Sequence, residues 1–185
     1  TDDLFGKRIG IVGMGGNGRR LVEVLRPFQV QMRATDFFPE NPPDGLDELL
    51  PHTCLKRLAE WSEILILTLP LNKATRGIVD KEILGAMAPG GYLVNVARGA
   101  VVRELDLCEY LANGHLRGAG LDVTEVEPLP EASPLWGFDN VLITPHVGAQ
   151  AKRRTDDTCE LICENLRRYF ANQPLFNIVD KSLGF

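Results

Sequence analysis

Runs of apolar residues alternate along this chain with segments in which apolar residues recur at helical spacing. The apolar runs predict strands at residues 8–13, 29–36, 63–70, 91–97, 117–123 and 140–145, with a turn or short strand at the start of residues 46–61. The periodic segments predict helices from about Gly16 to Pro27, in the second part of residues 46–61, from about Asp80 to Met87, within residues 103–114, and from about Ala149 to Asn172. We therefore predict an α/β, doubly wound fold with a mostly parallel sheet and helices on both faces.

The first predicted strand runs into a glycine-rich turn, GIVGMGGNGRRL, and then into a helix. Backbone amides at a helix N-terminus bind phosphate well. Gly13 permits the tight turn, Gly15 lets a pyrophosphate approach the backbone, and Gly18 lets the helix pack close to the strand. The next strand ends at Asp36, at about the 20-residue offset expected for a ligand of the adenosine ribose. This arrangement predicts a dinucleotide site, although a nucleoside-binding methyltransferase would use the same features.

The residues after the second strand predict which dinucleotide binds. A carboxylate at Asp36 favours a free ribose 2'-hydroxyl, and Phe37 and Phe38 offer no cation for a 2'-phosphate. We therefore predict NAD as the cofactor, in preference to NADP.

Composition and charge narrow the choice of partners. The chain has 185 residues, of which 44% are hydrophobic and 24% charged, and we expect residues 1–185 to form one domain. The formal net charge of -5 argues against general binding of nucleic acid. No run reaches the roughly 18 apolar residues of a membrane helix, and the first residues do not resemble a secretion signal. The expected location is the cytoplasm, and the expected partner is a small polar molecule.

The four cysteines do not predict a metal site. Cys54, Cys108, Cys159 and Cys163 lack the paired C-x-x-C spacing of a zinc site. We expect all four to be free thiols and most of them to fill the core.

Arg98, Glu127 and His146 each come shortly after one of the last three predicted strands. Parallel strands place their carboxyl ends at one edge, where ligands bind, so the three groups could meet over one pocket. A histidine can accept and return a proton near neutral pH, and an arginine fork binds a carboxylate at two points. A carboxylate that contacts the imidazole would fix its tautomer. We expect His52 and His115 to be structural or exposed.

The segments GMGGNG, VNVARGAVV, GLDVTEVEPLP and TPHVGA, together with Asp36, resemble the nucleotide-binding domain of the D-isomer-specific 2-hydroxyacid dehydrogenases. The resemblance covers nearly the whole chain and keeps the order of the family's motifs. It implies a Rossmann fold and hydride transfer between NAD(H) and a 2-hydroxy or 2-oxo acid. It also implies that Arg98 holds the substrate carboxylate, that His146 donates and accepts the proton, and that Glu127 supports His146.

The same resemblance implies further contacts with the cofactor. It places Asp122 near the nicotinamide carboxamide. It places four residues along the cofactor cleft: Leu69, Pro70, Val96 and Ala97. Most relatives carry a bulkier or basic residue and then an aliphatic residue inside the glycine turn, where this chain has Gly16 and Asn17. The backbone donors of these two residues are kept, so we include both in the expected cofactor site.

Two other enzyme classes fit the sequence poorly. A short-chain dehydrogenase needs Y-x-x-x-K, but no lysine lies four residues after Tyr92, Tyr110 or Tyr169. A methyltransferase has no use for the set of arginine, glutamate and histidine. A module that senses NAD(H), like the dehydrogenase-like corepressors, stays as the alternative function.

The resemblance also bears on how the chain works. Members of the family usually have a substrate domain whose first part precedes the glycine motif, so this chain is expected to be a fragment, an expressed domain or a stand-alone module. We expect a homodimer in the intact protein and little turnover by the chain alone. Which 2-hydroxy acid is the substrate stays open.

Overall fold

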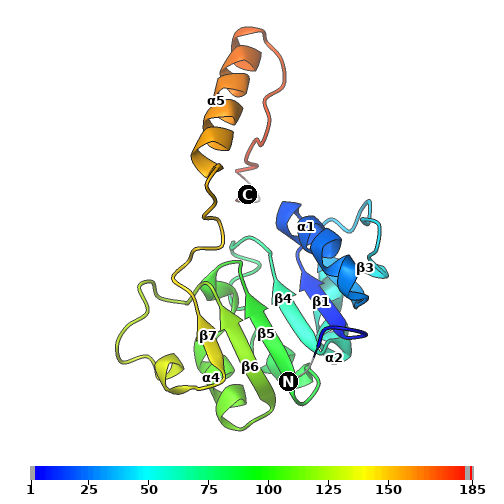
Figure 1. Ribbon diagram of the computed structural model, residues 1–185, viewed down its shortest axis with the longest axis vertical. Coiled ribbons are helices and arrows are strands. Elements are labelled where there is room, and N and C mark those ends of the chain that lie inside the picture. The colour runs from blue at the N-terminus through cyan, green and yellow to red at the C-terminus, as the bar shows by residue number, and fades with distance from the viewer. Residues whose placement is uncertain (1–2, 182–183, 185) are drawn as a thin grey trace. The chain divides into compact units, whose positions relative to one another are not determined.

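The apolar runs of the sequence form strands that lie side by side in one sheet (Figure 1). The structure is a computed structural model that describes residues 3–181 and residue 184. Within these residues the sheet has seven strands, all paired in parallel, in the order β3-β2-β1-β4-β5-β6-β7. They are β1 (Arg8–Val12), β2 (Gln31–Asp36), β3 (Glu48–Pro51), β4 (Ile64–Leu67), β5 (Gly91–Asn95), β6 (Leu116–Leu121) and β7 (Val141–Ile143). The strand order reverses at β1 and β4, which is where open α/β sheets bind ligands.

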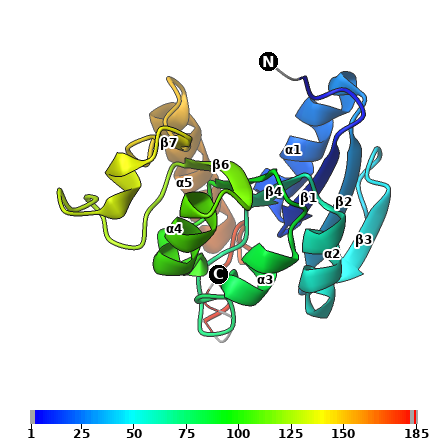
Figure 2. The ribbon, with the colours of Figure 1, turned by 90° about the horizontal axis from the view of Figure 1, so that it is seen from below.

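The chain divides into two compact units, which part between Pro145 and His146. In the first unit, helices cover both faces of the sheet (Figure 2). The α-helices described there are α1 (Gly16–Leu25), α2 (Leu55–Trp61), α3 (Lys81–Ala86) and α4 (Glu104–Ala112). Helix α1 lies on one face, and α2, α3 and α4 lie on the other. The predicted doubly wound α/β fold is therefore confirmed.

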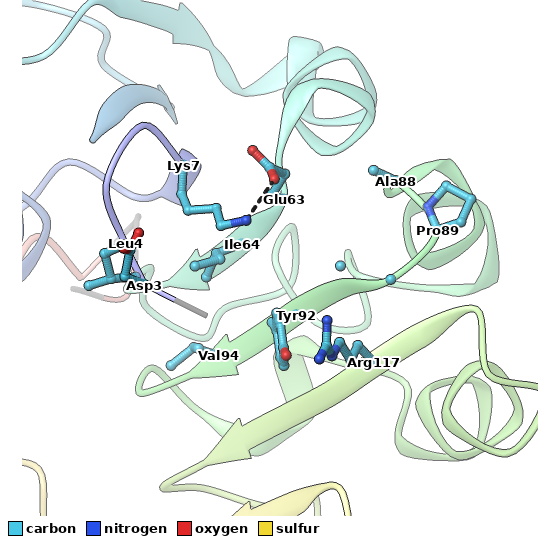
Figure 3. A pocket seen from close by; sticks show the side chains of 12 residues that line it. Asp3, Leu4, Lys7, Glu63, Ile64, Ala88, Pro89, Tyr92, Val94 and Arg117 are labelled. Carbon is cyan, nitrogen blue, oxygen red and sulfur yellow. Dashed lines mark hydrogen bonds and ion pairs between the residues drawn. The ribbon is translucent and has the colours of Figure 1, made fainter. Parts of the chain in front are cut away.

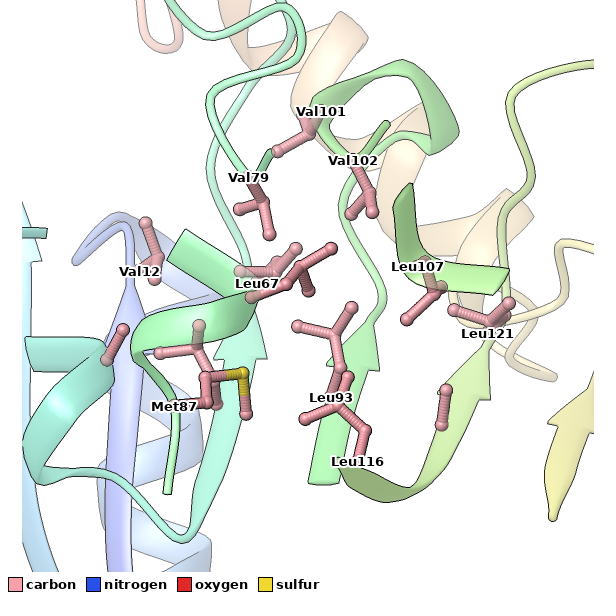
Figure 4. Packing of buried hydrophobic residues seen from close by; sticks show 14 of the residues in the cluster. Val12, Leu67, Val79, Met87, Leu93, Val101, Val102, Leu107, Leu116 and Leu121 are labelled. Atoms are coloured by element: carbon pink, nitrogen blue, oxygen red, sulfur yellow. The ribbon is translucent and has the colours of Figure 1, made fainter. Parts of the chain in front are cut away.

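Two clusters of buried apolar side chains hold the helices to the sheet. The larger cluster joins β4, β5 and β6 to α2, α3 and α4, and includes Leu67, Leu93 and Leu107 (Figure 4). The smaller cluster joins β1 and β2 to α1 and includes Ile11 and Val22. Full burial of one such side chain stabilises the fold by about 1.5–3 kcal/mol. The strands therefore form a rigid platform for the loops at their carboxyl ends.

Local signals in the sequence fix where helices begin and end. The Asp80 carboxylate caps α3 by accepting hydrogen bonds from the backbone N–H groups of Glu82 (2.9 Å) and Ile83 (3.2 Å). Helix α4 ends before Asn113 and Gly114, as the sequence predicts, and Gly114 adopts a positive φ of 75°. The first boundary ends the loop that follows β4, and the second begins the turn that leads into β6.

The second unit is built on α5 (Arg154–Phe170), a helix with no buried residue. The prediction that this helix begins near Ala149 is wrong by five residues, because a turn closed by the Gln150 N–H and the Val147 carbonyl (2.8 Å) precedes it. After the helix the chain folds back, and the Asn165 side chain bonds both backbone groups of Phe176. In the part of the chain that the structure describes, no helix is long and apolar enough to cross a membrane.

The cysteines only partly match the prediction. All four are free, as expected. Cys108 is buried and Cys54 is half-buried, but Cys159 and Cys163 are exposed on α5. The expectation that most cysteines fill the core is wrong for this pair, because both lie on α5, a helix with no buried residue.

Candidate active site

The glycine turn is packed so tightly that two of its glycines leave no space for a side chain. Gly13 begins the turn after β1 with a φ of 100°, and a Cβ there would lie 2.8 Å from the backbone nitrogen of Leu69. A Cβ on Gly18 would collide with the carbonyl oxygen of Gly13. The close approach of α1 to β1 that the sequence predicts therefore depends on both glycines.

The other side of the turn is open. Gly15 and Gly16 are exposed, and a Cβ on either would meet no atom within 4 Å. Gly15 is the N-cap of α1, and no side chain caps the helix. The first amides of α1, including those of Gly16 and Asn17, therefore keep their donors for another group. This bare, positive end of a helix fits a pyrophosphate.

Asp36 lies beside this turn at the end of β2, and two backbone amides hold its carboxylate. Oδ2 accepts from the N–H of Met14 at 2.6 Å, and Oδ1 accepts from the N–H of Phe38 at 2.7 Å. Each carboxylate oxygen has two lone pairs, so the group can accept further hydrogen bonds from a ribose. The carboxylate therefore faces the turn in one fixed orientation.

The loop after β2 bonds to a cation that the sequence reasoning did not weigh. The Arg19 guanidinium, on α1, donates to the backbone carbonyls of Glu40 (3.2 Å) and Asn41 (2.7 Å) in the loop after β2. In the same corner Phe37 stacks on His52, with ring centroids 4.0 Å apart. His52 thus has a structural contact, as expected.

Arg98 and Glu127 follow neighbouring strands. Asn95 at the end of β5 is in register with Leu121 at the end of β6, so the loops that follow leave the same edge of the sheet. Nη1 of Arg98 donates to the carbonyl of Ala97 at 2.6 Å. Oε1 of Glu127 accepts from the N–H of Thr124 at 3.2 Å. The structure therefore brings these two predicted residues to one edge.

His146 is the first residue of the second unit. Its side chain is exposed, and its backbone has a left-handed φ of 53°. Arg98 and Glu127 belong to the first unit and His146 to the second, so the meeting of the three side chains stays a prediction.

The remaining predicted cofactor residues lie after β4, β5 and β6. Leu69 and Ala97 are buried, Pro70 is half-buried, and Val96 is exposed. The Asp122 carboxylate accepts a 2.6 Å hydrogen bond from the hydroxyl of Thr144, which follows β7.

Sequence reasoning missed three polar residues at this edge: Asn95, Thr124 and Thr144. The signal was present for Asn95, which is a polar residue inside the apolar run GYLVNVA. A buried amide in such a run needs hydrogen-bond partners and therefore calls for an explanation.

A depression lies at the edge of the sheet formed by the amino ends of the strands, opposite the edge that holds the glycine turn (Figure 3). It has a volume of about 650 Å³ and is lined by residues at the amino ends of strands, among them Lys7, Glu63 and Tyr92. Lys7 and Glu63 form an ion pair across it, with 3.4 Å between Nζ and Oε1. Its position separates it from the glycine turn and from Arg98.

The glycine turn at the switch point of a parallel sheet, with an acid at the end of the next strand, defines a Rossmann dinucleotide-binding domain. The sequence profile of the family described as D-isomer specific 2-hydroxyacid dehydrogenase, NAD binding domain, matches residues 1–148. The chain therefore belongs to the D-isomer specific 2-hydroxyacid dehydrogenase family.

Individual relatives agree with this assignment. A hydroxyphenylpyruvate reductase from Plectranthus scutellarioides is 34% identical over 180 residues, which are 97% of this chain and 56% of that protein. A D-isomer specific 2-hydroxyacid dehydrogenase from Xanthobacter autotrophicus Py2, solved with NADPH and MES, is 38% identical with a TM-score of 0.90, over 97% of this chain and 73% of that chain. An NADPH-dependent glyoxylate/hydroxypyruvate reductase from Sinorhizobium meliloti, solved with NADP and sulfate, is 28% identical with a TM-score of 0.91, over 100% of this chain and 59% of that chain. The chain spans 56–59% of the length of the curated relatives it matches.

Proposed function

We propose that this chain is the nucleotide-binding half of an oxidoreductase that interconverts 2-hydroxy acids and 2-oxo acids. One observation carries the proposal: the edge of the sheet that holds the open glycine turn and Asp36 also holds the paired loops of Arg98 and Glu127. Names of relatives such as hydroxyphenylpyruvate reductase support the same chemistry. The alternative of a pure NAD(H) sensor finds no support among these relatives.

Each polar residue has a role in this proposal. Arg98 binds the substrate carboxylate through its planar fork of donors. His146 gives a proton to the substrate oxygen during reduction and takes it back during oxidation, with Glu127 as the carboxylate that supports the imidazole. The bound nicotinamide cofactor supplies or accepts the hydride at the substrate carbon. Gly15, Gly16 and Asn17 would hold its pyrophosphate.

We propose NAD as the preferred cofactor. If a 2'-phosphate replaced the ribose hydroxyl beside Asp36, the carboxylate and the phosphate would repel each other. Arg19, the cation found in this corner, already donates to two carbonyls. The solved relatives with NADPH or NADP show that members of the family also use the phosphorylated cofactor. The choice in this chain therefore depends on Asp36.

The setting of the reaction is also part of the proposal. We propose a homodimer for the complete protein, by resemblance to the family. Four free cysteines fit a reducing compartment such as the cytoplasm. The chain alone is expected to turn over 2-oxo acids negligibly, because an open cleft leaves water around the Arg98 guanidinium and holds the substrate loosely.

The proposal is tested by assaying NADH oxidation against a panel of 2-oxo acids, with this chain and with a complete protein of the relatives' length. We expect turnover of at least one acid by the complete protein and a loss of about 100-fold or more on His146→Ala. His115→Ala is the matched control, because His115 lies against Tyr110 away from this edge and its loss should leave turnover unchanged. A complete protein that binds NADH but reduces no 2-oxo acid would favour the sensor function.

A further inference from the structure

The loops that carry Arg98 and Glu127 are each held by a side chain that has no role in the proposed chemistry. We propose that Asn95 and Thr124 are positioning residues: Asn95 fixes the turn of Arg98, and Thr124 fixes the turn of Glu127. This inference rests on the proposed function, because it takes the roles of Arg98 and Glu127 from there.

Asn95 closes the turn that leads to Arg98. The side chain is 1% exposed. Oδ1 accepts from the N–H of Ala97 at 3.0 Å, and Nδ2 donates to the carbonyl of Arg98 at 3.1 Å. Only one of the two orientations of the amide satisfies both partners, since one needs an acceptor and the other a donor. The side chain therefore holds the backbone of Arg98 in a single conformation.

The Arg98 side chain bonds to the same turn. Its Nη1 donates to the carbonyl of Ala97 at 2.6 Å. The N–H of the same residue, Ala97, donates to the Asn95 side chain, so Ala97 links the guanidinium to Asn95. The backbone carbonyl of Asn95 also accepts from the N–H of Asp122 at 3.0 Å. A change at Asn95 would therefore release the guanidinium as well as the backbone.

Thr124 plays the equivalent part for Glu127. It is 9% exposed, and its hydroxyl donates to the carbonyl of Val126 at 2.9 Å. This bond closes the loop so that the carboxylate of Glu127 returns to the N–H of Thr124, at 3.2 Å. Without the hydroxyl, the Thr124 N–H is still present. The loop, however, loses the hydrogen bond to Val126 that keeps the Glu127 carboxylate close to this N–H.

The turn that carries Arg98 and the turn that carries Glu127 also pack directly against each other. A Cβ on Gly99, the residue after Arg98, would collide with the backbone carbonyl of Thr124. The cavity left beneath this contact has a volume of only about 10 Å³. The N–H of Glu125 further donates to the Glu104 carboxylate of α4 at 3.0 Å. Two turns packed in this way cannot shift independently of each other.

The first arm of the test measures KM and kcat for a 2-oxo acid in the active complete protein. We expect Asn95→Ala and Asn95→Asp to raise KM by about tenfold, as a small misplacement of a binding group does, with a smaller change in kcat. Asn95→Asp keeps the side-chain volume and the acceptor for Ala97 but removes the donor to Arg98, so it serves if Asn95→Ala fails to fold. Asn140→Ala is the matched control, because it removes an amide-to-carbonyl bond, to Arg117, outside this turn.

A double-mutant comparison separates positioning from general stability. In an Arg98→Met background, Asn95→Ala should change KM by less than about twofold, because the group that it positions is gone. An equal fold-change in both backgrounds would overturn the positioning role. If Arg98→Met itself leaves KM unchanged, the proposed function fails first, and the two failures are thereby distinguished.

The second arm applies the same logic to Thr124. Thr124→Val should reproduce the effect of Glu127→Gln on kcat and on the pH profile. In the double variant it should add nothing to the effect of Glu127→Gln. Thr124→Ser, which keeps the hydroxyl, should have the kcat and pH profile of the unchanged protein. NADH affinity, measured on each variant, should stay close to that of the unchanged protein, which shows that the nucleotide site is still folded. A Thr124→Val protein with normal kcat and pH profile would contradict the proposal.

Discussion

The first unit and the second unit differ in how they bury apolar surface. The first unit has two clusters of buried side chains, one on each face of its sheet. In the second unit, α5 has no buried residue, and apolar side chains such as Ile162, Leu166 and Phe170 are more than half exposed. The glycine turn, Asp36, Arg98 and Glu127 all belong to the first unit. The residues proposed to bind the cofactor therefore all lie in the unit that holds both buried clusters.

His146 belongs to the second unit, and none of the residues that the structure describes there is buried. A segment of this size buries too little surface to be stable alone. Most of the stability of a helix in a protein comes from packing of its apolar face, and α5 has no buried residue. Under the proposed function, binding of the cofactor and transfer of the proton therefore depend on different parts of the chain. Changes in the two units should therefore have very different effects.

The largest expected effect is on the core of the first unit. Leu93→Ala should lower the free energy of unfolding by about 2–5 kcal/mol, because it leaves a cavity in the larger cluster. Leu93 is fully buried on β5, two residues before Asn95. Urea denaturation of the chain, followed by far-ultraviolet circular dichroism, measures the change. A loss below about 1 kcal/mol would mean that the cluster does not hold the sheet as described.

A smaller contrast is expected in the reactivity of the cysteines. Burial raises the pKa of the Cys108 thiol, and the nearby Glu104 carboxylate raises it further. The thiolate is the reactive form, so at pH 7 Cys108 should react with N-ethylmaleimide at least about tenfold more slowly than Cys159 and Cys163. The gap should narrow as the pH rises above the ordinary cysteine value, because Cys108 then ionises as well. Mass spectrometry of timed samples resolves the sites, and equally fast labelling of Cys108 would contradict the description of its burial.

The smallest effect is expected on α5. Leu166 is 52% exposed, so Leu166→Ala should change the free energy of unfolding of the chain by no more than about 0.5 kcal/mol. The same urea titration gives this value beside that of Leu93→Ala. A loss as large as the one at Leu93 would show that the second unit buries this face, and the comparison between the units would fall.

Much of the first unit could be predicted from the sequence, because strands and helices there have strong patterns. The run EILILTLP contains β4, although the strand ends at Leu67 and not at Pro70, and the stop at Asn113 and Gly114 corresponds to the observed end of α4. The start of α5 was placed too early because residues near Ala149 do not distinguish a turn from a first helical turn. A helix without buried residues lacks the packing that would fix its start.

For the candidate site, the sequence predicts which residues reach one edge of the sheet but not what they contact there. Asp36 could be predicted from its distance to the glycine turn, since strand and helix lengths fix that spacing. Its hydrogen bond to the Met14 amide could not, because that bond joins the end of β2 to the turn after β1, which are 22 residues apart in the sequence. The same holds for Asn95, whose partners depend on the conformation of the turn that follows β5. Sequence patterns specify which residues reach an edge, whereas the local turn decides what each residue touches.

We propose that the glycine turn and Asp36 form a nucleotide site selective for NAD. The direct measurement is a fluorescence titration of this chain with NADH and with NADPH, repeated on Asp36→Ala and on the control Asp139→Ala, an exposed loop residue. We predict tighter binding of NADH, and an increase in its Kd of about tenfold or more on Asp36→Ala, because a hydrogen bond to a charged group is lost. The NADPH Kd should change less or fall, and Asp139→Ala should change neither. Absence of saturable binding of either cofactor would contradict the site, and NADPH binding as tight as NADH binding would contradict the role of Asp36.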